Sequence, residues 1–113
     1  MVGNRSLVVW YNFAMMTLAE IKEILKAQKP YLAERYGVVE LAVFGSYVRG
    51  EQQANSDLDV LIDVERPPKI SLIDLVELEA YLSEQLNTEV DVALKTNLKP
   101  RIGRHILREM EPV

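Results

Sequence analysis

The segment Asp57–Val64 constrains the fold of this 113-residue chain more than any other, because apolar and polar residues alternate along it almost without exception. One set of alternate positions is apolar: Leu58, Val60, Ile62 and Val64. The other set holds three aspartates and one leucine: Asp57, Asp59, Leu61 and Asp63. Successive side chains of a strand point to opposite faces of its sheet. The segment is therefore predicted to be a strand with one buried face and one face that carries carboxylates.

Two further segments have the composition of strands. Val38–Phe44 is short, rich in β-branched and aromatic residues and followed by a glycine, which is typical of a buried strand. Glu89–Leu94 follows the turn-forming residues Asn87 and Thr88 and is apolar apart from two acidic residues. Together the three segments predict a small sheet.

The first predicted helix begins at a capping box, in which Thr17 and Glu20 satisfy each other's backbone N–H groups. Apolar residues then recur at roughly helical spacing as far as Tyr36, and Gly37 is placed to stop the helix. Pro30 lies inside this segment. Because proline lacks a backbone donor and its ring clashes with the preceding turn, we expect it to kink the helix or split it in two.

Two more helices are predicted in the second half of the chain. Ser71 and Asp74 form another capping box, and the helix they open extends to about Leu86. A final helix begins at about residue 98 and is expected to turn four apolar residues inward: Leu98, Ile102, Ile106 and Met110. The order helix–strand–turn–strand–helix–strand–helix indicates an α/β or α+β domain, with a small mixed sheet flanked by helices.

The length fits a single domain, which we assign to residues 17–113. Residues 1–16 form an N-terminal extension with no assigned role, in which Trp10 and Phe13 are candidates to cover an interface. The extension is apolar but lacks a small-residue cleavage pattern, which disfavours a secretory signal. A natural start at Met15 or Met16 is a further interpretation.

Composition excludes several classes of function. The absence of cysteine excludes disulfides, thiolate zinc sites and a cysteine nucleophile, and it suits a cytoplasmic protein. Residues 1–94 hold 15 acidic and 8 basic side chains, whereas residues 95–113 hold 2 acidic and 5 basic ones. An acidic body disfavours direct binding to nucleic acid, while the basic end could meet phosphate or an acidic partner. No apolar run is long enough to span a membrane.

Asp57 and Asp59 share one face of their predicted strand, about 6–7 Å apart at Cα. Two carboxylates at that spacing repel each other where solvent is scarce. Mg²⁺ prefers oxygen ligands and commonly takes a few carboxylates together with substrate phosphates. The pair therefore suggests a metal site, and the plainer alternative is two solvated aspartates on the wet face of a strand.

Gly45 and Ser46 stand at the end of the preceding strand. A glycine there lets the backbone approach a phosphate closely, and a short helical turn over Ser46–Arg49 would aim N–H groups at it. A lone Gly-Ser pair indicates only a turn. The order of the motifs along the chain is stronger evidence than the pair alone. The Gly-Ser turn precedes the strand with the two aspartates, which places a phosphate site and a metal site at neighbouring strand ends. Tyr47, in the same turn, could stack on a base or simply be exposed.

Asp91 is the third acidic candidate. It is isolated among apolar residues of a predicted strand, where aspartate is depleted and costly to bury without a partner. One interpretation is a salt bridge, for example to Lys95. The other is a third ligand beside Asp57 and Asp59, which would complete the carboxylate cluster needed to hold two metal ions.

These residues together carry a resemblance to a known family. The pattern Gly-Ser-x-x-Arg-Gly-x5-Ser-Asp-x-Asp, followed by an aspartate on a later strand, resembles the DNA polymerase β-type nucleotidyltransferase superfamily. More narrowly, it resembles the minimal nucleotidyltransferase (MNT) antitoxins that are encoded beside HEPN toxins. Every fixed position is filled: Gly45, Ser46, Arg49, Gly50, Ser56, Asp57, Asp59 and then Asp91. The resemblance covers about residues 17–113 and implies the nucleotidyltransferase fold.

The resemblance implies nucleotide-binding roles for two residues and catalytic, metal-binding roles for three. Gly45 and Ser46 would hold the triphosphate of the substrate ATP. Asp57 and Asp59 would bind both of two Mg²⁺ ions. Asp91 would ligate the catalytic ion and help to deprotonate the acceptor hydroxyl.

Two more residues of the pattern are assigned to the nucleotide site. Arg49 would steady the phosphates or the turn, and the alternative is a structural salt bridge with Glu51 or Asp63. Ser56 would cap the entrance of the strand or touch a metal-bound water.

Larger members of the superfamily carry an extra domain that binds the acceptor, and this chain has no room for one. The resemblance therefore implies an antitoxin that transfers AMP to a hydroxyl, expected to be a tyrosine, of a cognate HEPN ribonuclease toxin. Two alternatives stay open: an antitoxin that neutralises the toxin by binding alone, and a transferase for a small molecule such as an antibiotic. Neither nucleic acid nor a membrane is an expected partner.

Overall fold

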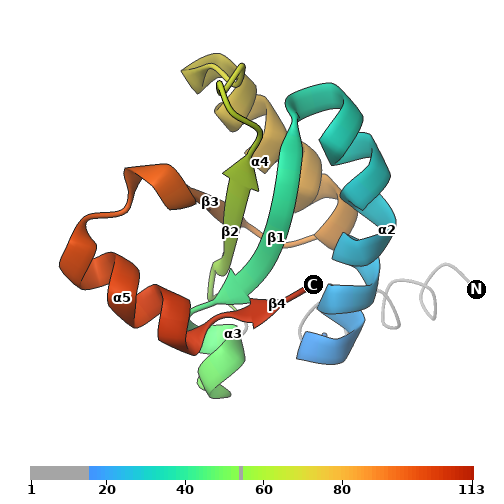
Figure 1. Cartoon of the computed structure of the whole chain (residues 1–113). Coiled ribbons are helices and arrows are strands. Elements are labelled where there is room, and N and C mark those ends of the chain that lie inside the picture. Colours follow the sequence, from blue (N-terminus) through green and yellow to red (C-terminus); the bar gives the residue numbers. More distant parts are fainter. Residues whose placement is uncertain (1–15, 54) are drawn as a thin grey trace, which may run out of the picture.

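The computed structural model describes residues 16–53 and 55–113. The predicted N-terminal extension, with Trp10, Phe13 and Met15, lies outside the described residues except for Met16, which packs against the core. The elements in chain order are α2 (Leu18–Tyr36), β1 (Val38–Phe44), α3 (Ser46–Arg49), β2 (Leu58–Val64), α4 (Leu72–Leu86), β3 (Val90–Leu94), the 3₁₀ turn η1 (Lys95–Asn97), α5 (Pro100–Glu109) and β4 (Glu111–Pro112) (Figure 1).

The sheet has four strands in the order β3-β2-β1-β4. β1 runs antiparallel to both β2 and β4, whereas β2 and β3 run parallel. A parallel pair needs a long crossover, which α4 provides between β2 and β3. The predicted mixed sheet flanked by helices is confirmed, and β4 is an addition, because two residues carry no periodicity that a sequence pattern could reveal.

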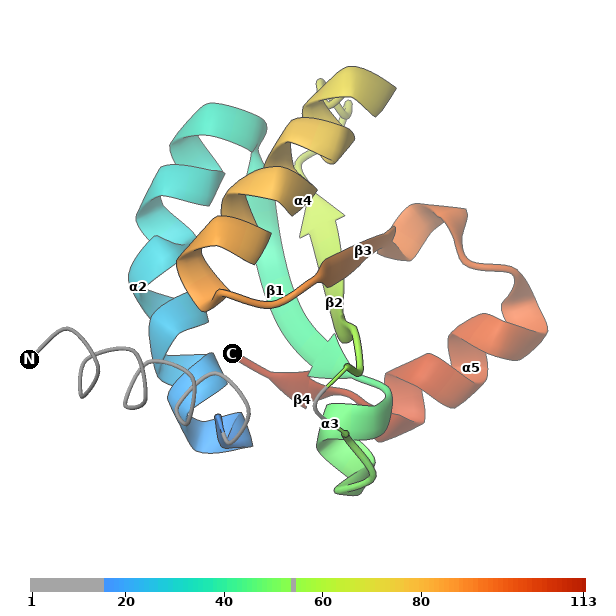
Figure 2. The same cartoon turned by 180° about the vertical axis from the view of Figure 1, so that it is seen from behind.

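The main core lies between the sheet and the two long helices α2 and α4, which cover the same face (Figures 1 and 2). Its largest fully buried side chains come from all these elements: Ile21, Leu25, Leu32, Leu58, Ile62, Leu78, Leu82 and Leu86. Full burial of each contributes about 1.5–3 kcal/mol. The four apolar positions of the predicted alternation in β2 are all buried, which confirms its phase.

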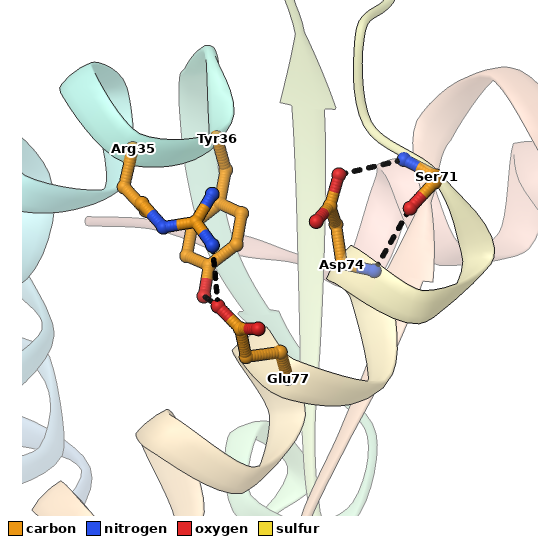
Figure 3. Close-up of polar contacts among 5 residues, drawn as sticks. All are labelled: Arg35, Tyr36, Ser71, Asp74 and Glu77. Carbon is orange, nitrogen blue, oxygen red and sulfur yellow. Dashed lines mark hydrogen bonds and ion pairs between the residues drawn. The ribbon is translucent and has the colours of Figure 1, made fainter.

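Both predicted capping boxes are present, and Figure 3 shows the second of them. Ser71 Oγ accepts a hydrogen bond from the backbone of Asp74 at 3.1 Å, and Asp74 Oδ2 accepts one from the backbone of Ser71 at 3.0 Å. The same view shows Glu77 of α4 accepting hydrogen bonds from the Tyr36 hydroxyl, at 2.7 Å, and from Arg35 of α2, at 2.8 Å. These contacts join the two helices at their outer edge.

α2 continues through Pro30 as one helix, so of the two predicted effects of this proline, a kink or a split, the split does not occur. Leu25 and Leu32 are both fully buried, and they hold the two halves of the helix on the sheet. Gly37 ends the helix with φ of 72°, as predicted. No helix in the described part of the chain is long and apolar enough to cross a membrane.

α5 covers part of the opposite face of the sheet, where a small second cluster forms around three buried residues: Ala42, Leu61 and Ile106. The helix begins at Pro100, later than predicted, because η1 precedes it. The expectation that Ile102 points inward is wrong, since its side chain is 57% exposed. Gly103 takes the buried position instead, where a Cβ would lie 3.2 Å from the Cβ of Leu98. The helix therefore packs against Leu98 through Gly103, while Ile106 contacts the sheet residues of this cluster.

Candidate active site

The candidate residues gather at one end of the sheet. β1 ends there, while β2 and β3 begin there, because β1 is antiparallel to β2 and β2 is parallel to β3 (Figure 1). In the register of the sheet, Asp59 is paired with Phe44 on one side and with Asp91 on the other. The turn after β1 and the aspartates of β2 and β3 thus lie at neighbouring strand ends.

Asp59 and Asp91 occupy matching positions on adjacent parallel strands. Neighbouring strands lie about 4.8 Å apart, and residues in register project to the same face of a sheet. This face is the one that α5 covers in part, since Leu61 of the α5 cluster has the same orientation as Asp59. Asp59 is half-buried, whereas Asp91 and Asp57, which immediately precedes β2, are exposed. The site is therefore open to solvent on the side of Asp57 and Asp91.

Three negative charges act on one another in this site. Burial raises the pKa of Asp59 above its usual value of 3.8, and the charges of Asp91 and Asp57 raise the pKa further, while Arg49 opposes them. A divalent cation among the three carboxylates would relieve this repulsion, and a set of oxygen donors alone suits Mg²⁺. The donor chemistry therefore fits the metal that the sequence predicts.

The side chains are not already arranged as a closed metal cage. Within residues 16–53 and 55–113, no three acidic or histidine side chains converge closely enough to enclose an ion. Coordination by all three aspartates therefore requires side-chain rotation. Asp57 and Asp91 can make this rotation because both are exposed.

The raised pKa of Asp59 leads to a prediction about stability. The folded chain holds the Asp59 proton more tightly than the unfolded chain, so in metal-free protein this residue lowers stability as pH rises above about 4. We expect the melting temperature of Asp59→Asn to exceed that of the wild type at pH 7, with a difference that shrinks toward pH 4. Thermal unfolding from pH 4 to pH 7 in the presence of a chelator measures this difference. A constant difference across the range would show that folding does not raise the pKa of Asp59.

Gly45 brings the backbone of the turn against Asp59. Its φ of 82° and ψ of −152° belong to a region that only glycine adopts readily. A Cβ at this position would lie 2.1 Å from Oδ2 of Asp59, so there is no room for a side chain. Ser46, half-buried, is the first residue of α3, where backbone N–H groups lack acceptors within the helix. The predicted helical turn at 46–49 is confirmed.

Arg49 and Glu109 form an ion pair beside this turn. Arg49 Nε donates to Glu51 Oε1 at 2.7 Å, and Arg49 Nη1 donates to Glu109 Oε1 at 2.6 Å. The other oxygen of Glu109 accepts a hydrogen bond from the backbone N–H of Gly45 at 2.9 Å. The predicted pairing of Arg49 with Glu51 is confirmed. Sequence reasoning missed Glu109, whose only signal is an acidic residue in an otherwise basic helix.

The alternative pairing of Arg49 with Asp63 is wrong, because Asp63 contacts Arg66 at 3.5 Å. Ser56 Oγ accepts a hydrogen bond from the backbone of Gln53 at 2.8 Å and so closes the loop before β2. Ser56 therefore acts as a cap near the strand entrance in this structure.

The interpretations of Tyr47 and Asp91 are corrected. Tyr47 is 8% exposed and belongs to the main core, so it is neither an exposed turn residue nor placed to stack on a base. Lys95 pairs with Glu40 at 3.6 Å and not with Asp91. Asp91 is exposed rather than buried, because α5 leaves its part of the sheet face uncovered. The apolar sequence around Asp91 reflects the opposite, buried face of β3.

Comparisons with known proteins agree with this arrangement. Residues 19–112 match the family model of the nucleotidyltransferase domain. The protein adenylyltransferase MntA of Thermococcus cleftensis is 50% identical over 97 residues, which are 86% of this chain and 96% of that protein. A protein of Methanocaldococcus jannaschii, assigned as a protein adenylyltransferase, is 51% identical over 97 residues, or 85% of this chain and 97% of that one.

Solved structures share the fold. A structure assigned as a minimal nucleotidyltransferase has a TM-score of 0.66 at 33% identity, and the match covers 82% of this chain and 95% of that one. A toxin–antitoxin structure with AMP-PNP has a TM-score of 0.66 at 21% identity, over 81% of this chain and 70% of that one. At this lower identity the second likeness concerns the fold alone.

Proposed function

Because this chain belongs to the nucleotidyltransferase domain family, we propose that it transfers AMP from ATP to a hydroxyl of a HEPN-type toxin and thereby acts as the antitoxin. The observation that carries the proposal is the placement of Asp59 and Asp91 in register beside the Gly45 turn. The relative from Thermococcus cleftensis bears the name protein adenylyltransferase, and it aligns over nearly its whole length. This relationship favours a protein acceptor over a small molecule.

The reaction exchanges a phosphoanhydride bond of ATP for a phosphoester bond to the acceptor. The acceptor oxygen attacks the α-phosphorus of ATP, the bond from that phosphorus to the bridging oxygen of the β-phosphate breaks, and pyrophosphate leaves. The hydroxyl proton passes to a carboxylate, for which Asp91 is the candidate because it is exposed at the edge of the site. Mg²⁺ held by Asp57, Asp59 and Asp91 would supply positive charge to the phosphates and to the acceptor oxygen.

Each element of the site has a separate task in this scheme. The Ser46 hydroxyl and the first N–H groups of α3 hold the triphosphate. Asp59 is half-buried and lies against the Gly45 turn, so its carboxylate has a fixed position between the turn and the other aspartates. The exposed side, next to Asp57 and Asp91, is where the acceptor hydroxyl enters. A tyrosine suits this entrance, because its hydroxyl stands at the end of a long rigid side chain.

Binding without catalysis is the second candidate function. Three apolar side chains at the start of α4 are strongly exposed: Leu72 at 79%, Ile73 at 78% and Val76 at 61%. Contiguous exposed apolar residues often mark a protein–protein contact. A toxin held there could be neutralised without nucleotide.

Intact-mass spectrometry of a HEPN-type toxin from the same genome tests the proposal. The toxin is incubated with this chain, ATP and Mg²⁺, and in parallel with the Asp57→Asn/Asp59→Asn variant. A gain of one or more AMP units with the wild type alone is the expected result. A stable complex of the two proteins without any gain in mass would refute AMP transfer and support the binding antitoxin.

A further inference from the structure

Glu109 connects the two ends of the α3 turn from a distant part of the chain. One carboxylate oxygen accepts the hydrogen bond from Gly45 N, at the start of the turn, and the other contacts Arg49 Nη1, at its end. The Glu109 side chain is only 11% exposed. A single carboxylate thus holds both boundaries of the segment that carries Ser46.

The direction of the Gly45 N–H follows from the sheet. Val113 N donates to Leu41 O at 2.9 Å, so Leu41 turns its backbone groups toward β4. Alternate residues of a strand turn their backbone groups to the same side, and Val43 and Gly45 therefore face β4 as well. Val43 is paired with Glu111, which leaves Gly45 opposite Glu109. The Glu109 carboxylate takes the place of the next backbone acceptor in this ladder.

This placement separates Glu109 from the phosphate position. Hydrogen bonds of a ladder lie within the plane of the sheet, whereas side chains such as Asp59 project from its face. The Gly45 N–H is therefore directed sideways, toward α5, and Glu109 does not occupy the space in front of Ser46. The carboxylate braces the turn from the side instead of competing with a nucleotide.

We propose that Glu109 is a positioning residue for nucleotide binding, which fixes the α3 turn so that Ser46 and its backbone N–H meet the triphosphate. The inference rests on the proposed function and deepens it, because it adds a residue of α5 to the support of the phosphate site. Arg49 is held by Glu109 and Glu51 together, which sets the direction of its guanidinium group. Burial raises the pKa of Glu109, but the hydrogen bonds from Arg49 and Gly45 outweigh it and lower the pKa, which keeps the carboxylate charged at neutral pH.

The test compares Glu109→Ala and Glu109→Gln with the wild type in binding of AMP-PNP with Mg²⁺ and in AMP transfer to the toxin. Removal of the carboxylate is expected to raise the Kd for AMP-PNP and the KM for ATP about tenfold, the range for losing a hydrogen bond to a charged group. The KM for the toxin should stay unchanged. Glu109→Gln keeps an acceptor for Gly45 but loses the charge facing Arg49, so about half of the effect in free energy, a roughly threefold rise, is expected.

Glu111→Gln is the matched control. Glu111 lies two residues away, in β4. Its carboxylate forms an ion pair with Lys22 of α2 at 3.3 Å. Its replacement should leave the Kd for AMP-PNP within about twofold, since this ion pair joins β4 to α2 and does not contact the α3 turn. Circular dichroism and melting temperature establish that each variant is folded. If Glu109→Ala does not fold, Glu109→Gln still decides the question, because it preserves the shape of the side chain.

Several outcomes would overturn the inference. An unchanged Kd in both Glu109 variants would show that the turn keeps its geometry without this contact. Tighter binding of AMP-PNP would show that the carboxylate competes with the phosphates. Binding of AMP-PNP requires no acceptor, so the measurement also separates the two proposals. A chain that binds AMP-PNP in a Glu109-dependent way but modifies no toxin would sustain this inference and refute the proposed function.

Discussion

Replacement of Asp59 by asparagine is expected to reduce AMP transfer by at least about a thousandfold. Asp59 lies beside the Gly45 turn and is paired with Asp91 in the sheet, so it adjoins both halves of the candidate site. Asparagine keeps the shape but loses the charge that attracts a divalent cation. Single-turnover transfer of AMP to the toxin, with saturating ATP and Mg²⁺, measures the loss.

Asp63→Asn is the control for this prediction. Asp63 lies on the same strand with the same orientation, but toward the other end of β2, where it contacts Arg66. Its replacement should change the transfer rate by less than about twofold, because Asp63 lies away from the candidate site. Equal losses in the two variants would indicate a general effect of charge rather than a metal ligand. Loss of folding is not an expected explanation, since Asp59→Asn should stabilise the metal-free chain at neutral pH.

The features that could be predicted from the sequence are those determined by local patterns. The alternation of Asp57–Val64 gave the strand and its buried face, and the capping boxes at Thr17 and Ser71 marked the helix starts to the residue. Both signals arise within a few residues of one another, where backbone geometry alone decides which side chains meet. The positions of the candidate site residues relative to these strands followed directly.

The errors concern contacts between distant segments. The phase of α5 was misjudged at Ile102, because Gly103 allows a closer approach to Leu98 than a helical stripe of large residues would. Asp91 was expected to be costly to bury, yet whether it is buried depends on how much of the sheet α5 covers. Neither the closeness of α5 to Leu98 nor the area of the sheet that α5 covers can be predicted from the spacing of residues along the chain.

Glu109 illustrates the same limit at the site. Its partner Arg49 lies 60 residues earlier in the chain, and the contact arises only because β4 returns to the edge of β1. β4 itself is two residues long and includes a proline, which is a weak strand signal. A motif read along the chain identifies residues that touch the substrate, whereas the residues that support them come from elsewhere in the fold.

Replacement of Gly45 by alanine is expected both to destabilise the protein and to abolish AMP transfer. The backbone conformation at Gly45 costs any other residue about 1–3 kcal/mol. The added Cβ would also lie 2.1 Å from Oδ2 and 3.0 Å from Cγ of Asp59. Relief of this overlap requires Asp59 or the turn to move, and either movement separates the proposed phosphate site from the carboxylates.

Gly50→Ala separates the effect of strain from the effect of contact. Gly50 also has a positive φ, 72°, but a Cβ there would meet no atom within 4 Å. Gly50→Ala should therefore lower the free energy of unfolding by about 1 kcal/mol, the cost of a non-glycine residue in the left-handed region. It should cause little loss of activity. Urea unfolding and the transfer assay are measured for both variants. If Gly45→Ala lost no more activity than Gly50→Ala, close contact between the turn and Asp59 would be irrelevant to the reaction.

Combining Gly45→Ala with Asp59→Asn identifies the route by which the glycine acts. If alanine abolishes transfer by displacing the Asp59 carboxylate, the double variant should be no less active than Asp59→Asn alone, because residues in contact are not additive. If alanine instead damages the phosphate turn independently, the two losses should multiply. The first outcome is expected, since the atoms nearest to the added Cβ all belong to Asp59. Gly45 would then serve the reaction chiefly by leaving room for a carboxylate, in addition to approaching a phosphate.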